Sequence, residues 1–112
     1  MEVTIEQVGK VTIVGLPGEY LDAGNSKEFK RDITPVLEGH QQVIFDMSQL
    51  RFVDSSGLGA VLSCMRQLHA AGGTLKLCGM MKPVRALFDL VQMHRLLEVF
   101  DTKEEALRAF QA

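Results

Sequence analysis

The residues best suited to chemistry are an acidic residue and two serines, Asp54-Ser55-Ser56, which separate an apolar run from the first turn of a predicted helix. The first N–H groups of a helix have no partner within the helix, and the helix dipole places partial positive charge there. Backbone groups would therefore hold a phosphate on a serine at this position. An unmodified serine there is also a good helix cap. The segment thus predicts a phosphorylation site, a helix cap, or a residue that serves as both.

The elements around the serines have clear patterns. Val43–Met47 is a near-continuous apolar run, which is typical of a strand buried on both faces. After the serines, apolar side chains recur at helical spacing until Gly72-Gly73, where a helix would end. The members of that stripe are Leu58, Val61, Leu62, Met65 and Leu68. The serines are therefore expected where a buried strand gives way to an amphipathic helix.

The first part of the chain predicts a β-hairpin and a helix. Apolar and polar residues alternate over residues 3–6 and 11–13, with Gly9-Lys10 as the turn. A helix capped by Asp22 or Asn25 should follow. Its apolar face would be Phe29, Ile33, Val36 and Leu37, with a kink or an irregular last turn at Pro35 before Gly39.

The last part of the chain predicts a strand, a helix, a strand and a helix. Thr74–Cys78 and Leu97–Phe100 are the strands, Pro83 fits a first helical position, and Thr102 with Glu105 has the spacing of a capping box. The inward side chains would be Val84, Leu87, Phe88, Val91, Leu107 and Phe110. The order β-β-α-β-α-β-α-β-α requires crossover connections, so an α/β fold is expected, with a mixed sheet and an N-terminal hairpin.

Composition limits the classes of function. The 112 residues suit one domain over residues 1–112, and a net charge of −2 with 12 scattered Lys and Arg argues against nucleic acid as a partner. No apolar run approaches the roughly 20 residues that span a membrane, and the first residues lack a signal peptide pattern, so we expect a cytoplasmic protein. Cys64, Cys78 and the 3 histidines lack metal-ligand spacing. We expect two reduced, buried cysteines, no metal and no cofactor.

Three groups of residues together resemble a STAS domain of the bacterial anti-sigma factor antagonist family. The first is Leu21-Asp22-Ala23 with Asn25 and Ser26. The second is Phe45–Leu50 running into Asp54-Ser55-Ser56-Gly57-Leu58-Gly59, and the third is Pro83-Val84 leading to Leu87-Phe88. The resemblance extends over essentially the whole chain, and the serine motif is its most specific part.

The resemblance implies a mixed α/β domain that binds proteins and has no catalytic activity of its own. In such a family, the unphosphorylated antagonist binds an anti-sigma factor that is also a serine kinase with a histidine-kinase-like ATP-binding fold, which releases the sigma factor. The kinase phosphorylates the serine directly after the motif aspartate, which is Ser55 in this chain. A PP2C-type phosphatase would reverse the modification. The protein itself would be a monomer or a weak homodimer.

The residues around Ser55 are candidates for partner binding: Asp22, Asp54, Ser56, Gly57, Leu58 and Gly59. The two glycines would let a kinase approach the backbone closely, although helix–sheet packing also explains a glycine. Asp22 would either face the partner or cap the first helix. Ser56 could be phosphorylated instead of Ser55, but as a first-turn residue it is expected to face into the turn.

Other classes fit the sequence less well. A serine nucleophile would need a G-x-S-x-G elbow and a partner histidine, and a phosphate-binding loop needs more than Gly57-Leu58-Gly59. Asp46, Asp54 and Asp101 could form the Mg²⁺ pocket of a phospho-accepting receiver domain, but no acidic pair follows the first strand, and the residue directly after the last strand is Asp101 and not a lysine. The main alternative within the resembled family is a scaffold subunit of a lipid-transport ATPase or a stressosome-like complex.

Overall fold

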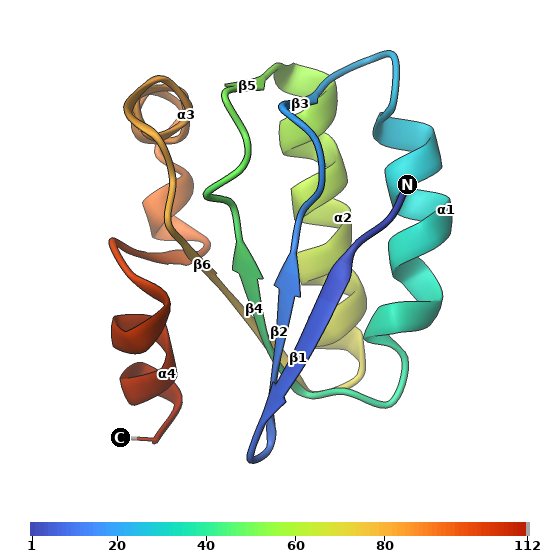
Figure 1. The fold of residues 1–112 in the computed structure, drawn as a ribbon, viewed down its shortest axis with the longest axis vertical. Coiled ribbons are helices and arrows are strands. Elements are labelled where there is room, and N and C mark those ends of the chain that lie inside the picture. The colour runs from blue at the N-terminus through green and yellow to red at the C-terminus, as the bar shows by residue number, and fades with distance from the viewer. Residues whose placement is uncertain (112) are drawn as a thin grey trace.

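A five-stranded sheet forms the centre of the molecule in the computed structural model, which describes residues 1–111 (Figure 1). Its strands, in spatial order, are β1 (Thr4–Val8), β2 (Val11–Gly15), β4 (Gln42–Asp46), β6 (Thr74–Cys78) and β7 (Glu98–Phe100). β1 and β2 form the antiparallel N-terminal hairpin, and the other neighbours pair in parallel. The predicted mixed sheet is confirmed.

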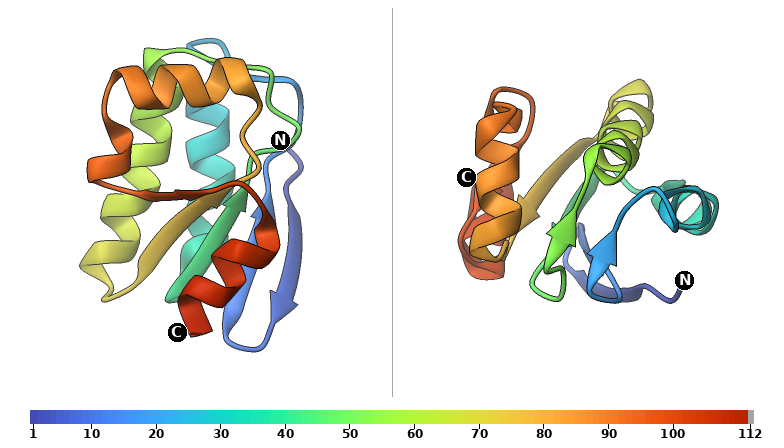
Figure 2. Two further views of the ribbon diagram at one scale, coloured as in Figure 1. Left: turned by 90° about the vertical axis from the view of Figure 1, so that its left-hand side faces the viewer. Right: turned by 90° about the horizontal axis from the view of Figure 1, so that it is seen from above.

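Helices cover both faces of this sheet (Figures 1 and 2). They are α1 (Ser26–Leu37), α2 (Ser55–Ala70), α3 (Lys82–Leu90) and α4 (Lys103–Gln111), with a short 3₁₀ turn, η1 (Met93–Arg95), after α3. α1 and α2 lie side by side on one face, and α4 lies on the other. Because β4 is sandwiched between these layers, Val43, Ile44 and Phe45 are completely buried, as their continuous apolar pattern predicted.

A second, two-stranded sheet was not predicted. β3 (Tyr20–Leu21) and β5 (Phe52–Val53) pair in parallel beyond the carboxyl ends of β2 and β4. Each has only two residues, which is too short for an alternating pattern to be visible in the sequence. With these strands the element order becomes β-β-β-α-β-β-α-β-α-β-α, which corrects the shorter order expected from the sequence.

The two ends of α1 lie where the sequence predicted but differ from expectation in detail. α1 continues through Pro35 to Leu37, and Gly39 then takes a φ of +80°, a conformation that glycine adopts without strain. Asn25 precedes α1 but does not cap it with its side chain, which instead accepts a hydrogen bond from the Asp22 backbone N–H at 2.9 Å. Of the two predicted caps, Asn25 is therefore the N-cap residue by position but makes no side-chain cap, and Asp22 is not the cap.

The C-terminal elements follow the predicted order, although β7 begins at Glu98, one residue later than expected. Thr102 Oγ1 accepts a hydrogen bond from the Glu105 N–H at 3.2 Å, as in a capping box. Val91 was expected in the core but is 47% exposed, because α3 ends at Leu90 and the chain turns there through a left-handed Gln92 (φ 58°). The helical spacing of the apolar residues therefore extends one residue beyond the helix itself.

Candidate functional site

Asp54, rather than a serine, is the cap of α2. One carboxylate oxygen, Oδ1, accepts a hydrogen bond from the Gly57 N–H at 2.9 Å. The other, Oδ2, accepts from the Ala23 N–H at 3.0 Å. The prediction that a serine caps this helix is therefore wrong. The single carboxylate both caps α2 and holds the loop between β3 and α1 against the start of that helix.

Ser55 and Ser56 are the first two residues of α2, and both are exposed. Their side chains are thus open to a modifying enzyme at the positive end of the helix dipole. The expectation that Ser56 faces into the turn is wrong. Both hydroxyls are thus accessible, and Ser55 is the one that directly follows the capping aspartate.

Asp22 lies in the loop between β3 and α1, and the hydrogen bond from Ala23 to Asp54 holds this loop at the start of α2. The Asp22 Oδ1 accepts a hydrogen bond from the Gly24 N–H at 2.8 Å, and its carbonyl oxygen accepts from the Ser26 N–H at 2.9 Å. Asp22 is half-buried and shapes the turn that leads into α1. The structure therefore brings the loop of Asp22 to the start of α2, although the two segments are about thirty residues apart in the sequence.

The remaining predicted site residues divide by burial. Gly57 and Leu58 are buried, whereas Gly59 is exposed. A Cβ atom at Gly57 would lie 2.2 Å from the carbonyl oxygen of Leu21, while a Cβ atom at Gly59 would have nothing within 4 Å. Close packing of α2 against β3 thus accounts for Gly57. Of the two glycines, only Gly59 offers an open backbone surface to a partner.

Two exposed aromatic residues at this end of the molecule were missed by the sequence analysis. Tyr20 on β3 stands opposite Phe52 on β5, with 51% and 55% of their surfaces exposed. The only hint in the sequence is an aromatic residue between Arg51 and Asp54, where a polar connection would otherwise be expected. Recognising the pair required the β3–β5 pairing itself.

The Gly57 N–H holds the pKa of the Asp54 carboxyl below its ordinary value, and the Ala23 N–H acts in the same direction. Because this pKa is lower in the folded state, the ionised cap stabilises the fold above the unfolded-state pKa of about 4. That contribution is lost as the pH falls through the lowered pKa. The cap should therefore be fully effective at neutral pH and fail only in acid.

We expect Asp54→Ala to lower Tm at pH 7 by about 5 °C, because a helix cap is lost in a domain of this size. Asp54→Asn is the matched control, since asparagine also caps helices but carries no charge. It should keep most of the stability at pH 7 and show a weaker loss of Tm between pH 5 and pH 2. Thermal denaturation followed by circular dichroism over this pH range measures both effects. An unchanged Tm in Asp54→Ala would contradict the capping role.

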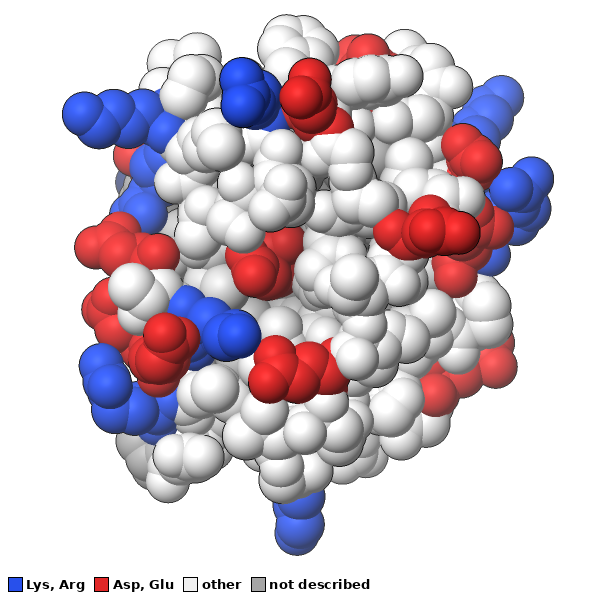
Figure 3. Space-filling view, viewed as in Figure 1, with Lys and Arg blue, Asp and Glu red and all other residues white. Residues whose placement is uncertain are grey.

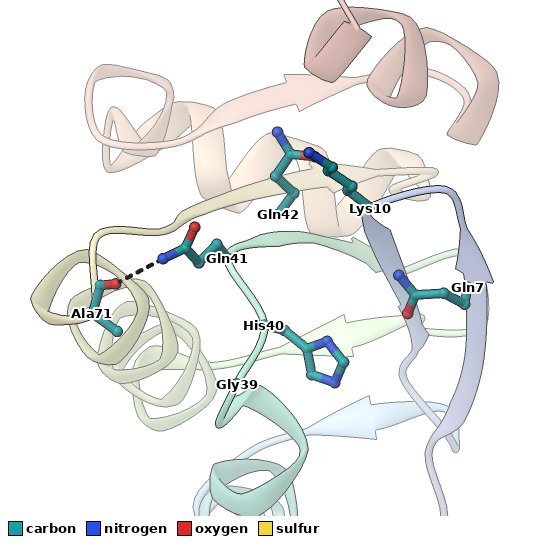
Figure 4. Close-up of a pocket in the computed structure, with 7 residues that line it drawn as sticks. All are labelled: Gln7, Lys10, Gly39, His40, Gln41, Gln42 and Ala71. Atoms are coloured by element: carbon teal, nitrogen blue, oxygen red, sulfur yellow. Dashed lines mark hydrogen bonds between the residues drawn. The ribbon is translucent and has the colours of Figure 1, made fainter.

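A polar hollow of about 590 Å³ lies at the opposite end of the sheet, where the parallel strands begin (Figure 4). Its lining comprises Gln7, Lys10, Gly39, His40, Gln41, Gln42 and Ala71. The Gln7 amide donates to the Gly9 carbonyl at 3.0 Å, so its oxygen accepts from the Thr12 hydroxyl at 2.8 Å. The His40 Nδ1, 3.0 Å from the same hydroxyl oxygen, is then the donor. This network is far from Ser55 and contributes nothing to the serine site.

The three aspartates of the receiver-domain alternative are engaged separately. Asp46 Oδ1 accepts from the Ser48 N–H at 3.1 Å, Asp101 pairs with Arg85 at 3.5 Å, and Asp54 caps α2. Within residues 1–111, no group of three or more His, Cys, Asp and Glu side chains is placed to hold a metal ion. The carboxylates thus do not form the shared pocket that the receiver alternative requires.

The cysteines, the charged surface residues and the helices bear on further expectations from the sequence. Cys64 and Cys78 are buried and unpaired, as expected, and burial raises the pKa of each thiol to about 12. Acidic and basic side chains are interspersed on the face shown in Figure 3. None of the helices in residues 1–111 has the length and apolar character needed to cross a bilayer.

Comparison with known proteins gives consistent matches. A family model described as the STAS domain matches residues 2–106. The anti-sigma F factor antagonist of Paenibacillus polymyxa is 28% identical over 109 residues, which cover 96% of this chain and 92% of that protein.

Solved structures show the same similarity. The anti-sigma factor antagonist SpoIIAA in its unphosphorylated form is 27% identical, with 99% of each chain covered and a TM-score of 0.70. The phosphorylated form of Bacillus SpoIIAA is 25% identical, with 97% of this chain and 99% of that chain covered and a TM-score of 0.70. An anti-sigma-factor antagonist (STAS) domain protein of Planctomyces limnophilus, 17% identical with 98% of each chain covered, has a TM-score of 0.88 and shares the fold.

Proposed function

Because this chain belongs to the STAS domain family, we propose that it is an anti-sigma factor antagonist controlled by phosphorylation of Ser55, with residues 1–112 as a single domain. The observation that carries the proposal is the exposed position of Ser55 in the first turn of α2, directly after the carboxylate that caps the helix. Relatives that are named anti-sigma factor antagonists support the proposed function. SpoIIAA, whose structure is known in the unphosphorylated and the phosphorylated form, supports the proposed control by phosphorylation.

In the proposed cycle, the unphosphorylated protein binds an anti-sigma factor that is also a serine kinase with a histidine-kinase-like ATP-binding fold. Binding releases the sigma factor. The kinase then transfers a phosphate to the Ser55 hydroxyl, the complex dissociates, and a PP2C-type phosphatase restores the binding form. The exposed members of the candidate set around Ser55, which are Ser56 and Gly59, would form part of the contact surface together with the half-buried Asp22 and Asp54.

The chain supplies the phosphate acceptor in this reaction and no catalytic group. Ser55 forms no hydrogen bond to a histidine in residues 1–111, so an activated serine nucleophile is not supported. The kinase would provide the nucleotide and the catalytic base. This assignment agrees with relatives that are named as regulators rather than enzymes.

The switch follows from charge at the start of α2. A phosphate adds about −1.5 to −2 charges at neutral pH. The Asp54 carboxylate already occupies the N–H groups of Gly57 and Ala23, so these donors are not free to neutralise the new charge. The hold on a phosphate that an unoccupied helix start would give, and that the sequence led us to expect, is therefore reduced. Most of the added charge would face the partner, beside a second carboxylate on its own chain and close to the phosphates of the kinase-bound nucleotide. Desolvating such an unpaired charge at an interface is costly.

We expect incubation with ATP and the anti-sigma factor kinase encoded in the same genome to add one phosphate, on Ser55. Peptide mapping by mass spectrometry locates the modified residue. The control is Ser55→Ala, which should bind the kinase and accept no phosphate, because the alanine keeps the fold and lacks the hydroxyl.

A phosphate on Ser56 would overturn the assignment of the site. A wild-type chain that binds no such kinase, or that binds it without being phosphorylated, would favour the scaffold alternative over the phosphorylation switch.

A further inference from the structure

The β3–β5 ribbon lies at the end of the molecule where α2 begins (Figure 1). It carries Tyr20 and Phe52 as a pair of exposed aromatic residues. We propose that this pair is the apolar anchor of the partner interface and receives an apolar side chain of the anti-sigma factor kinase. The proposal rests on the proposed function and extends it, because it identifies contact residues outside the serine motif.

Tyr20 and Phe52 are close enough to Ser55 to lie within the contact area of a protein that binds there. Phe52 precedes Ser55 by three residues, so their Cα atoms are at most about 10 Å apart. Tyr20 precedes Asp22 by two residues, and the loop of Asp22 contacts the α2 cap through Ala23. Both strands of the ribbon thus lead directly into the two segments of the candidate site. A kinase bound over Ser55 would cover the aromatic pair as well.

The ribbon holds the two rings on a rigid base. Leu21 and Val53, the paired residues next along each strand, are only 2% and 4% exposed. Since side chains alternate between the two faces of a strand, burial of Leu21 and Val53 turns Tyr20 and Phe52 outward. The backbone N–H of Phe52 also donates to the Glu19 carbonyl at 3.1 Å. Binding would therefore restrict little additional motion, which favours affinity.

The chemistry of the pair points to an apolar contact. Aromatic side chains are enriched at the centres of protein interfaces and often supply much of the binding energy. The neighbouring carboxylates accept hydrogen bonds from their own chain, Asp54 from Gly57 and Ala23 and Asp22 from Gly24. What the ribbon itself offers a partner is therefore the apolar faces of two rings.

The test compares three single substitutions in the full chain: Phe52→Ala, Tyr20→Ala and Ile5→Ala. Ile5 is the matched control, because it is also 55% exposed but lies on β1 at the outer edge of the main sheet. The probe is the purified anti-sigma factor kinase with ADP, and the affinity is measured by calorimetry. We expect Phe52→Ala to weaken binding about tenfold or more, Tyr20→Ala to weaken it less, and Ile5→Ala to leave it unchanged.

Each outcome decides between the proposals. If wild-type protein binds the kinase and Phe52→Ala binds equally well, the anchor is overturned while the proposed function stands. If wild-type protein does not bind, the proposed function is overturned and the anchor with it. If sedimentation shows dimers that Phe52→Ala converts to monomers without changing the affinity for the kinase, the pair belongs to a self-association surface and the anchor is overturned. Thermal denaturation confirms that each variant is folded.

Discussion

Ser55→Asp is expected to weaken binding to the anti-sigma factor kinase by about a hundredfold or more, which corresponds to roughly 2.7 kcal/mol. The substitution places a second carboxylate directly after Asp54, at an exposed position in the first turn of α2. On the free protein that charge remains in water. In the complex it would lose its water and approach the nucleotide phosphates of the kinase, so the cost appears only on binding.

The fold should tolerate this substitution. An acidic residue in the first turn of a helix interacts favourably with the helix dipole, and this offsets repulsion from Asp54. We therefore expect Tm to change by no more than about 2 °C. Loss of affinity with unchanged stability would separate a charge mechanism from unfolding.

Ser55→Asn provides the neutral control, because asparagine has nearly the shape of aspartate without its charge. It should bind the kinase within severalfold of the wild-type affinity. The measurement is calorimetric titration of kinase and ADP with each variant. Equal affinities of Ser55→Asp and wild-type protein would refute the charge mechanism, and equal weakening by Asp and Asn would replace it with a steric one.

Gly57→Ala is expected to destabilise the fold by about 2–3 kcal/mol, a typical cost of overpacking. The added Cβ would lie 2.2 Å from the Leu21 carbonyl oxygen and 2.9 Å from Val53 Cγ1. The closest atom belongs to the backbone of β3, which also accepts the Asp54 N–H at 3.3 Å, so it cannot rotate away as a side-chain end would. Relief requires α2 to move away from β3.

Gly59→Ala is the matched control, two residues further along the same helix. Nothing lies within 4 Å of its added Cβ, and alanine favours a helix over glycine by up to about 1 kcal/mol. This variant should therefore be as stable as the wild-type protein or slightly more stable. Urea denaturation gives the free energy of unfolding of both variants. A Gly57→Ala variant with wild-type stability would contradict the close packing of α2 against β3.

A displacement of α2 would also change the position of Ser55. Ser55 and Gly57 lie in the same helical turn, and Asp54 joins that turn to the loop of Ala23. We therefore interpret Gly57 as a residue that positions the serine and not as a residue that a partner touches. In the segment Asp54–Gly57, Gly57 is thus required for packing against β3, and Ser55 supplies the hydroxyl proposed for modification.

The main elements could be predicted from the sequence because their causes are local. The continuous apolar residues of β4, the helical spacing of α2 and the capping box at Thr102 each depend on neighbours a few residues apart. Those patterns placed Ser55 at the start of a helix after a buried strand. The sequence misjudged two details, the regular helix through Pro35 and the exposure of Val91, where packing, rather than local preference, determines how far a helix continues.

By itself, then, the sequence determined where the serine motif lies along the chain and which side chains can carry a phosphate. Only the tertiary structure decided how the motif is held. Asp54 caps α2 through a local hydrogen bond from Gly57, but its second oxygen also reaches Ala23, 31 residues away, and Gly57 is required because β3 passes against it. The exposed pair of Tyr20 and Phe52 likewise exists only because two short strands, distant in the sequence, pair with each other. Such contacts depend on the path of the whole chain and leave no local pattern in the residues that make them.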